Sequence, residues 1–446
     1  MIDLLLVLLF SILGVVTGVA TGLLPGLHVN NIALILLSMS GSIVLSLSFL
    51  IDYGISENFV LLLLCIYIIS TSLSHTFHDT IPTTFLGAPD EDTALSVLPA
   101  HSLLLEGKGF EAVALSAMGS YGAIIICFLV LLPIRSVIGW PIYFYETLRE
   151  IMIFVLISIS ILMLATEKGK ITDFGNKGKK PAIIGMLFAV LIFIISGFFG
   201  SIILNFSVDS PIGLPSPVLF PALAGLFGTP TLLTSLMTKP NIPEQKTDSF
   251  ILDSKAKKDS AISVLTGSFG GILVSIIPGI TSATGTILAM NARGESDKRQ
   301  TIVTLSAVNT ACAFFVVVVL FIILRARSGA AIAAMELITI QEWADLMMPT
   351  NLVYLLISMI FGGMLSYFST IYLGKLWARK FSKVPYQKVI MATIFLVTIL
   401  VFLFTGLLGL FILVAATLIG LLPVQWGVRR SHCMGVLLIP IIIHFL

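Results

Sequence analysis

Two Pro-Gly dipeptides interrupt long apolar runs, and each is followed by residues that could bind an anion. After Pro25-Gly26 come a histidine and two amides, His28, Asn30 and Asn31. After Pro278-Gly279 come three hydroxyls, Thr281, Ser282 and Thr284. A Pro-Gly break at membrane depth leaves helix-end N–H groups free, and the next half-helix starts with a partial positive charge. We therefore predict that these residues and both breaks hold a small anion; helix capping and tight packing are the alternative.

Three more polar side chains lie inside or beside one long apolar run. Asn309 is inside that run, where an amide is costly unless paired, so it bonds either to another helix or to the substrate. Arg325 and Arg327 follow the run near its predicted outer end. They either extend to the membrane interface or contact an anion, with Ser328 and Gly329 beside them.

A polar stretch in the first half of the chain could couple transport to the movement of protons or other ions. We predict coupling roles for four of its residues, His75, His78, Asp79 and Asp90. No metal site is predicted, because the chain has no His-Glu-x-x-His sequence and its four cysteines lack metal-binding spacing. An intramembrane enzyme is an alternative that would need His75, His78 and Asp79 within hydrogen-bond reach of one another.

The composition sets the environment in which these residues act. Of the 446 residues, 57% are hydrophobic and 11% are charged, whereas soluble domains average about 25% charged residues. Such a chain cannot cover its surface with polar groups in water. This excludes a soluble enzyme, a secreted disulfide scaffold and a nucleic-acid binder, and it indicates a multi-pass protein of the cell membrane. Long Leu, Ile and Val runs favour helices over barrel strands, which would alternate apolar and polar residues.

The apolar runs define the predicted membrane helices, because a bilayer core about 30 Å thick needs about 20 apolar residues. We predict spans at 4–24, 29–50, 58–78, 109–132, 150–166, 181–204, 260–277, 280–292, 301–324, 351–374, 388–410 and 431–446. Two more segments, 211–237 and 411–424, are Pro-rich or short and suit broken or re-entrant helices. The predicted fold is all-α and polytopic, with about 10–12 transmembrane or re-entrant helices.

Basic loops set the predicted orientation. Residues 167–180, 239–258 and 375–388 each carry five Lys or Arg residues and at most three acids. Cytoplasmic loops of membrane proteins carry such an excess, so we place these three loops in the cytoplasm. No Lys or Arg precedes Lys108, which favours a retained first helix that starts outside the cell.

An internal repeat relates the two Pro-Gly segments. The same four residues occur at a constant offset of 253 positions: Gly14, Gly18, Pro25 and Gly26, then Gly267, Gly271, Pro278 and Gly279. The two segments would enter the membrane from opposite faces, as in inverted-topology repeats that bind substrate near the bilayer midplane. A common Pro-Gly turn is the alternative. We predict a first repeat at 1–166, a linking part at 167–258 and a second repeat at 259–446.

The sequence resembles the TctA family, the large membrane subunit of tripartite tricarboxylate transporters. The resemblance rests on the two Pro-Gly hairpins, on Asn309-Thr310 and on the stretch 86–115, where Glu106-Gly107-Lys108-Gly109 takes the place of the family's Gly-(Lys/Arg)-Gly. It covers most of residues 10–330, and residues 427–432 resemble a divergent, archaeal-type branch. The family pattern carries over to six positions: Pro25, Gly26, Pro89, Pro278, Gly279 and Asn309.

These features predict a secondary transporter for a small organic anion such as a carboxylate. Helix starts would hold the anion, and one repeat would move against the other. The chain has no Gly-x-x-x-x-Gly-Lys sequence for a nucleotide, and no cofactor or enzymatic role is expected. The paired hairpins also resemble translocases of polyprenyl phosphate, so a flippase that binds a lipid phosphate is the alternative.

The expected partners follow from the resemblance and from the composition. The resemblance implies a small membrane subunit and an extracytoplasmic binding protein. Membrane lipid and a second copy of the chain are further expected contacts, whereas nucleic acid is not. The substrate is left open, because His28-Val29-Asn30-Asn31 replaces the family's Gly-Pro after the first Pro-Gly-Leu.

Overall fold

The protein is seen in a computed structural model that describes residues 2–24, 29–87, 97–167, 179–213, 218–238, 243–247, 253–277, 280–294, 297–381 and 386–446. Across these ranges the regular structure is entirely helical, which confirms the all-α prediction. Nine helices of this part are long and apolar enough to cross a membrane. A tenth span would combine α10 (Phe144–Glu150) and α11 (Met152–Ala165), which meet at 74°. The chain is therefore a multi-pass membrane protein.

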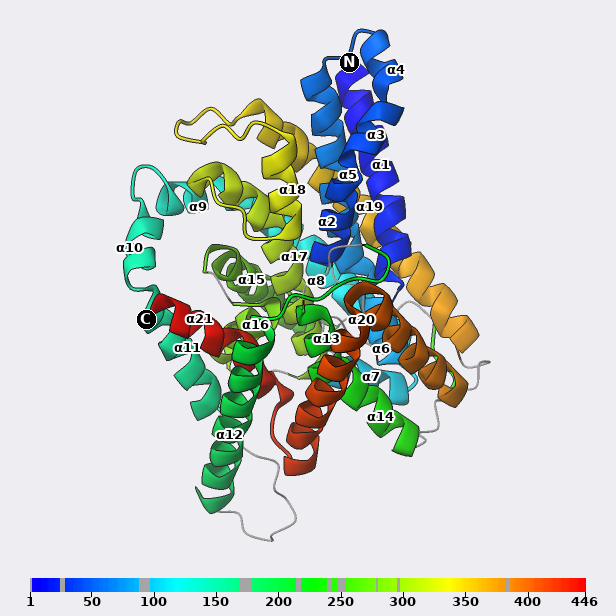
Figure 1. Ribbon diagram of the computed structural model, residues 1–446, viewed down its shortest axis with the longest axis vertical. Helices are drawn as coiled ribbons and strands as arrows, with labels where there is room; N and C mark the ends of the chain where they lie inside the picture. Colours follow the sequence, from blue (N-terminus) through cyan, green and yellow to red (C-terminus); the bar gives the residue numbers. More distant parts are fainter. Residues whose placement is uncertain are drawn as a thin grey trace.

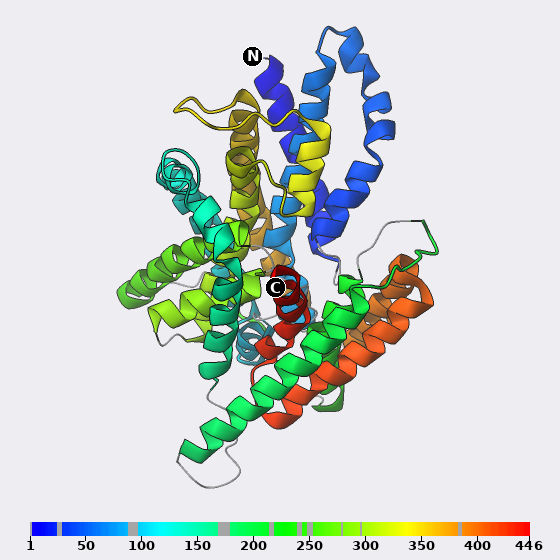
Figure 2. The same ribbon diagram turned by 60° about the vertical axis from the view of Figure 1, so that its left-hand side comes forward.

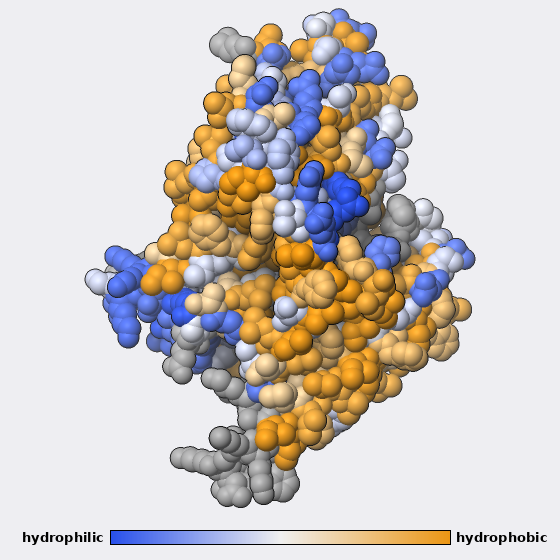
Figure 3. Space-filling view, turned by 90° about the vertical axis from the view of Figure 1, so that its left-hand side faces the viewer, coloured by the Kyte–Doolittle hydropathy of each residue, from blue (hydrophilic) through white to orange (hydrophobic). Residues whose placement is uncertain are grey.

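The surface suits a lipid environment. Hydrophobic residues dominate the face drawn in Figure 3, and hydrophilic residues gather in separate patches. Large apolar side chains are exposed on several helices, including Phe154 on α11 and Phe198 on α12 (Lys179–Ile203). Such exposure would be unfavourable in water, whereas lipid chains can cover these residues.

The first group of helices follows the chain from its N-terminus. It contains α1 (Ile2–Gly22), α2 (Val29–Ser38), α3 (Ser40–Ser46), α4 (Ser48–Asp52) and α5 (Glu57–His78). α1 and α5 lie side by side, and α2 to α4 return along them in Figure 1. The predicted span 29–50 is thus three short helices instead of one.

Glycine allows α1 and α5 to approach closely. A Cβ atom at Gly14 would lie 2.5 Å from the Tyr67 carbonyl oxygen, and one at Gly18 would lie 2.6 Å from that of Thr71. Any larger residue at either position would therefore push the two backbones apart. Small residues are used in this way at helix contacts in membranes, where hydrophobic burial does not drive association.

The second group has the same kind of contact. α15 (Ser254–Ile276) packs against α17 (Lys298–Ile323), and the shorter α16 (Ser282–Arg293) packs against both. A Cβ atom at Gly267 would lie 2.6 Å from the Thr304 carbonyl oxygen, and one at Gly271 would lie 2.4 Å from that of Val308.

The two groups interlock through two further long helices. α8 (Gly109–Leu129) packs against α17, where a Cβ atom at Gly119 would lie 2.5 Å from the Val303 carbonyl oxygen. α19 (Thr350–Phe381) packs against α5 and α8. Thus α8, which follows the first group in the chain, packs against the second group, and α19, which follows the second group, packs against the first.

The remaining helices surround this centre. They are α6 (Thr80–Leu86), α7 (Val97–Leu105), α9 (Leu131–Ile138), α13 (Leu219–Leu223), the π-helix η2 (Ala224–Gly228), α14 (Thr229–Thr238), α18 (Gly329–Leu337), α20 (Tyr386–Trp426), the 3-10 helix η3 (Arg430–Met434) and α21 (Gly435–Phe445). Figure 2 shows α12 and α20 running side by side.

Two segments differ from the sequence prediction. The predicted span 388–410 and the short segment 411–424 correspond to α20, whose two helical parts meet at a kink at Gly406, four residues before the predicted boundary. Gly406 has φ +63°, which glycine adopts without steric cost. The Pro-rich segment 211–237 is continuously helical from Leu219 onward, because Pro221 lies in the first turn, where a missing N–H costs no helical hydrogen bond; a π-turn at Ala224–Gly228 follows.

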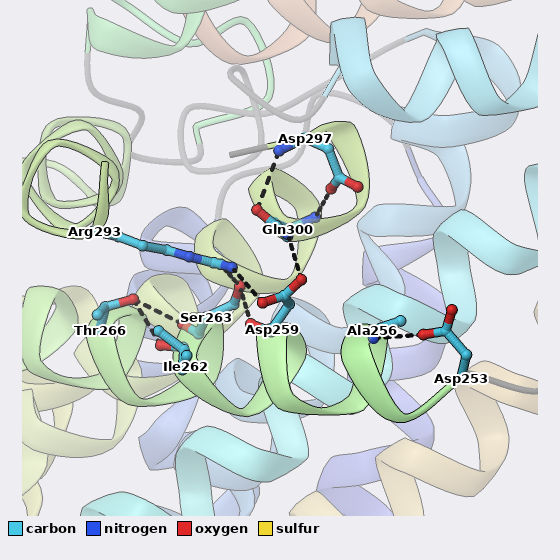
Figure 4. Close-up of polar contacts among 9 residues, drawn as sticks. All are labelled: Asp253, Ala256, Asp259, Ile262, Ser263, Thr266, Arg293, Asp297 and Gln300. Atoms are coloured by element: carbon cyan, nitrogen blue, oxygen red, sulfur yellow. Dashed lines mark hydrogen bonds and ion pairs between the residues drawn. The ribbon is translucent and has the colours of Figure 1, made fainter. Parts of the chain in front are cut away.

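Polar contacts tie α15, α16 and α17 together at the start of α17 (Figure 4). Asp297 caps α17 by accepting a bond from the Gln300 N–H at 2.8 Å, and the Gln300 side chain donates to Asp259 of α15 at 3.2 Å. Arg293, at the end of α16, donates to the Ser263 hydroxyl and lies 3.9 Å from the Asp259 carboxylate. Arg293 therefore anchors the end of α16 to α15.

Candidate anion-binding site

A cavity of about 330 Å³ lies where the two groups of helices meet. Its walls come from α2, α5, α13, α15, α16, α17, α18 and α21. The polar residues that line it are Asn30, Ser72, Thr76, Thr281, Ser282, Asn309, Cys312, Arg327 and Ser328. The cavity thus brings together five of the predicted site residues, which are separated by almost 300 positions in the chain.

Helix starts face this cavity. Thr281 is the N-cap of α16 and accepts a hydrogen bond from the Thr284 N–H at 3.5 Å. Ser328 is the N-cap of α18 and accepts one from the Ala331 N–H at 3.2 Å. α2 is described from Val29, which also lines the cavity. The start of a helix carries a partial positive charge, so these ends favour an anion.

Asn30 joins two of these helices. Its side-chain oxygen accepts a hydrogen bond from the Gly329 N–H at 2.8 Å, which ties α2 to the first turn of α18. A Cβ atom at Gly329 would lie 2.5 Å from the Asn30 carbonyl oxygen, so the glycine is what allows this approach. Asn30 therefore both lines the cavity and positions the start of α18.

Arg327 is the single cation among the described lining residues, and none of them is a carboxylate. Its Nη2 donates to the Tyr145 hydroxyl at 2.9 Å, and its guanidinium lies 5.4 Å from the centre of the Tyr145 ring. Its Nε and Nη1 are buried and have no hydrogen-bond partner within the described part of the chain. Burial lowers the pKa of Arg327, but a guanidinium keeps its charge at neutral pH.

A second polar group at the cavity is also left without a partner. The Ser72 hydroxyl on α5 is buried and makes no hydrogen bond to any residue that the structure describes. Buried polar groups are rarely left in this state, because each lost bond costs free energy. Water or a ligand in the cavity would satisfy both Ser72 and Arg327.

Asn309 and Ser282 form the side of the cavity between α16 and α17. The Ser282 hydroxyl lies 3.4 Å from the Asn309 side-chain oxygen and donates to it. Thr284 is buried two positions further along α16 and is not among the lining residues. The structure therefore brings Thr281 and Ser282 to the cavity but leaves Thr284 within the packing of α16.

The predicted coupling residues His75 and His78 lie elsewhere on α5, and Asp79 links α5 to α6. His75 Nδ1 is 3.2 Å from the Thr21 hydroxyl of α1, and His78 Nε2 is 2.8 Å from the Ser369 hydroxyl of α19. Both histidines and Asp79 are buried, and none lines the cavity. No group of three or more His, Cys, Asp or Glu residues in the described ranges could hold a metal ion.

Arg325 lies two positions before Arg327 but does not line the same cavity. It lines another cavity, of about 500 Å³, together with the carboxylate residues Glu146, Glu150 and Glu342. Tyr145 lines this second cavity and contacts Arg327 of the first. The pair of arginines predicted to contact an anion is therefore divided between two places.

Several predicted residues cannot be placed. Pro25, Gly26, His28, Asp90, Pro278 and Gly279, and the side chain of Asn31, lie outside the described residues. Sequence reasoning did not select Ser72, Thr76 and Tyr145. Ser72 and Thr76 were detectable as two hydroxyls one helical turn apart in an apolar run, whereas nothing near Tyr145 in the sequence indicates its contact with Arg327.

Comparison with known proteins identifies the family. The model of the tripartite tricarboxylate transporter TctA family matches residues 8–435. The chain belongs to the TctA family. A TctA-family chain is a membrane component of a transporter, and this agrees with the helical, lipid-facing architecture and with a non-enzymatic role.

A full-length relative from an archaeon is similar to this TctA-family chain. "Uncharacterized protein MJ1079" of Methanocaldococcus jannaschii is 28% identical over 445 residues, which cover 98% of this chain and 99% of the relative. No solved structure matches. The name of this relative assigns it no function, so the role of the cavity follows from the residues themselves.

Proposed function

We propose that this TctA-family chain is a secondary transporter for a small organic anion and that the cavity around Arg327 is its substrate site. The observation that carries this proposal is the half-buried guanidinium of Arg327, whose buried Nε and Nη1 have no partner in the described part of the chain, at a cavity that helix starts also line. Buried donors that lack an acceptor are unfavourable. A bound carboxylate would supply the missing acceptors and the missing negative charge, and such charge-assisted bonds are about twice as strong as neutral ones.

The proposal includes alternating access by two repeats, and a second set of residue pairs supports it. Gly14 and Gly18 approach the carbonyls of Tyr67 and Thr71. Gly267 and Gly271, which lie 253 positions after these glycines, approach the carbonyls of Thr304 and Val308, which lie 237 positions after Tyr67 and Thr71. The same offset of 237 relates Ser72 to Asn309, and both line the cavity. A substrate site formed by equivalent positions of two repeats is expected at their shared axis.

The family name supports a role within a three-part system. We propose that the chain works with a small membrane subunit and an extracytoplasmic binding protein that delivers the anion. The three basic loops would face the cytoplasm, and α1 would start on the opposite side. This orientation and the unit boundaries at 1–166, 167–258 and 259–446 remain part of the proposal.

A native thiol provides the test. Cys312 is half-buried and lines the cavity, whereas the thiols of Cys65, Cys127 and Cys433 are fully buried. In the full chain reconstituted in lipid nanodiscs, we expect N-ethylmaleimide to modify Cys312 and a bound carboxylate to slow this reaction. Acetate, phenylacetate, succinate and citrate are the probes, and Cys312→Ala should remove the labelling.

Matched arginine variants make the test specific to the site. Arg327→Gln should abolish protection of Cys312, whereas Arg325→Gln should retain it, because Arg325 lines the other cavity. If no carboxylate slows the labelling of the wild-type protein, the proposed substrate site is wrong. Protection by farnesyl phosphate but by none of the carboxylates would instead favour a translocase for polyprenyl phosphate.

A further inference from the structure

We propose that the substrate of this cavity is a monocarboxylate with an apolar body, and not a tricarboxylate. This inference rests on the proposed function and concerns the same site. Its basis is the chemistry of the cavity wall, which has a single positively charged corner and an extensive aliphatic surface.

The charge of the wall matches one carboxylate. Arg327 is the single cation among the described lining residues, and it offers Nε and Nη1 to a ligand. A tricarboxylate carries about three negative charges at neutral pH, because carboxyl groups titrate near pH 4. Two of these charges would then be buried without a cationic partner, which is unfavourable in a site of low polarity.

The helix starts do not supply a second full charge, and some of their N–H groups are already used by the protein. The Thr284 N–H is taken by Thr281, the Ala331 N–H by Ser328 and the Gly329 N–H by Asn30. Each helix start carries a partial positive charge of about half an elementary charge, and the oxygens of the side-chain caps already interact with it. These ends support one carboxylate near Arg327, but their partial charges do not replace a second cation among the described lining residues.

Much of the wall is aliphatic. It comprises Leu219 of α13, Val274 of α15, Ile277 at the C-cap of α15, Ile280, Val316 of α17, and Leu437 and Ile441 of α21. A tricarboxylate has almost no hydrocarbon surface to place against these residues. A branched aliphatic or aromatic skeleton would be covered by them, and burial of apolar surface is favourable. Pockets of this kind combine an apolar wall with a few polar groups that orient the ligand.

The experiment compares carboxylates that differ in charge and in apolar area. For the reconstituted full chain, the concentration that halves the rate of Cys312 alkylation is measured for phenylacetate, 4-methylpentanoate, acetate, succinate and citrate. We expect phenylacetate and 4-methylpentanoate to act at concentrations at least tenfold lower than acetate, succinate or citrate. Phenylacetamide, which lacks the charge, should give no protection.

The outcomes separate this inference from the proposed function. If citrate protects Cys312 at a lower concentration than either apolar monocarboxylate, the inference is wrong and the anion site stands. If none of the carboxylates protects, both are wrong. If acetate acts at the same concentration as phenylacetate, the aliphatic wall does not contact the ligand, and the inference is again overturned.

Variants in the aliphatic wall provide an independent check. Ile441 is half-buried near the end of α21, so Ile441→Ala should be tolerated by the fold. We expect Ile441→Ala or Leu437→Ala to weaken protection by phenylacetate about tenfold, since lost methylene contacts in a pocket have effects of this size. Protection by acetate should not change. Equal losses for both ligands would mean that the variants disturb the fold and not the apolar contact.

Discussion

The two ends of α17 carry the same kind of charge in opposite settings. Around its start, Arg293 and Lys298 have carboxylate partners, Asp259 and Glu106 respectively, and Arg299 is paired with Glu111. Beyond its other end, Arg327 has a tyrosine hydroxyl as its partner and lies at a cavity. The cations at the start are occupied by carboxylates, whereas the guanidinium beyond the end retains binding capacity.

The difference shows how a structural cation can be told from a functional one in this chain. An arginine whose donors are all used by carboxylates or carbonyls has no bonds left for a ligand. Arg135 is a further example of the structural kind, because it is fully buried and donates to the carbonyl oxygens of Trp140, Trp343 and Asp345. Free donors beside a cavity, and not burial alone, distinguish Arg327.

The largest effect is expected from Arg327. Arg327→Gln removes the cation and keeps a similar length, so anion uptake should fall about 10- to 100-fold, because hydrogen bonds to charged groups contribute about 1.5–3 kcal/mol. Uptake by proteoliposomes measures this change, with Arg325→Gln as the matched control. Equal losses in the two variants would contradict the contrast between the cavities.

Neighbouring residues at the start of α16 sharpen the same contrast. Ser282 lines the cavity and Thr284 does not. Ser282→Ala should weaken anion binding about tenfold or less, as expected for one neutral hydrogen bond. Thr284→Val, which keeps the volume, should leave affinity unchanged. Half-saturating concentrations for uptake distinguish the two, and a larger loss in Thr284→Val would show that the cavity wall has been assigned wrongly.

The paired cations at the start of α17 should behave in the opposite way. Arg293→Gln breaks a half-buried contact with Asp259 and Ser263, and we expect a loss of about 1–2 kcal/mol in the free energy of unfolding. Binding measured by protection of Cys312 should be unchanged. A normal melting temperature with weakened binding would reverse the roles given to the two ends.

The smallest effect is expected from Glu106, which is accessible to solvent. Hydrogen bonds from Lys298, and then Lys108, lower the pKa of Glu106 to about 2. Its stabilising contribution should be present above its ordinary pKa and should disappear as the pH falls through about 2. Glu106→Gln should lower the melting temperature by about 2 °C or less between pH 5 and 8, because salt screens exposed pairs. A larger shift would mean that this pair holds α7 and α17 together.

The sequence predicted most of the long membrane helices, because hydropathy depends on local composition, whereas the predicted span 29–50 is three short helices. It also selected Asn30, Ser282, Asn309 and Arg327, since a polar residue in an apolar run is costly and therefore needs a partner. The separation of Ser282 from Thr284 was not predictable from composition, because it depends on the direction in which each side chain leaves α16.

Contacts between distant parts of the chain were also missed. Tyr145 resembles an ordinary interfacial tyrosine in sequence, and its bond to Arg327 exists because α10 folds back toward the end of α17. The boundary between the predicted segments 388–410 and 411–424 follows residue 410, whereas the kink of α20 lies at Gly406, because this residue tolerates a positive φ.

The glycine contacts along α1 and α15 have a consequence for electrical insulation. A transporter that cycles between two open states has to keep protons and small cations from crossing the bilayer beside its substrate. Where Gly14 and Gly18 meet α5, and Gly267 and Gly271 meet α17, a single added carbon atom would already collide with a carbonyl oxygen. Water has no room at these four contacts. Under the proposed alternating access, each helix pair would move as one intact wall, and the membrane potential across it would be preserved.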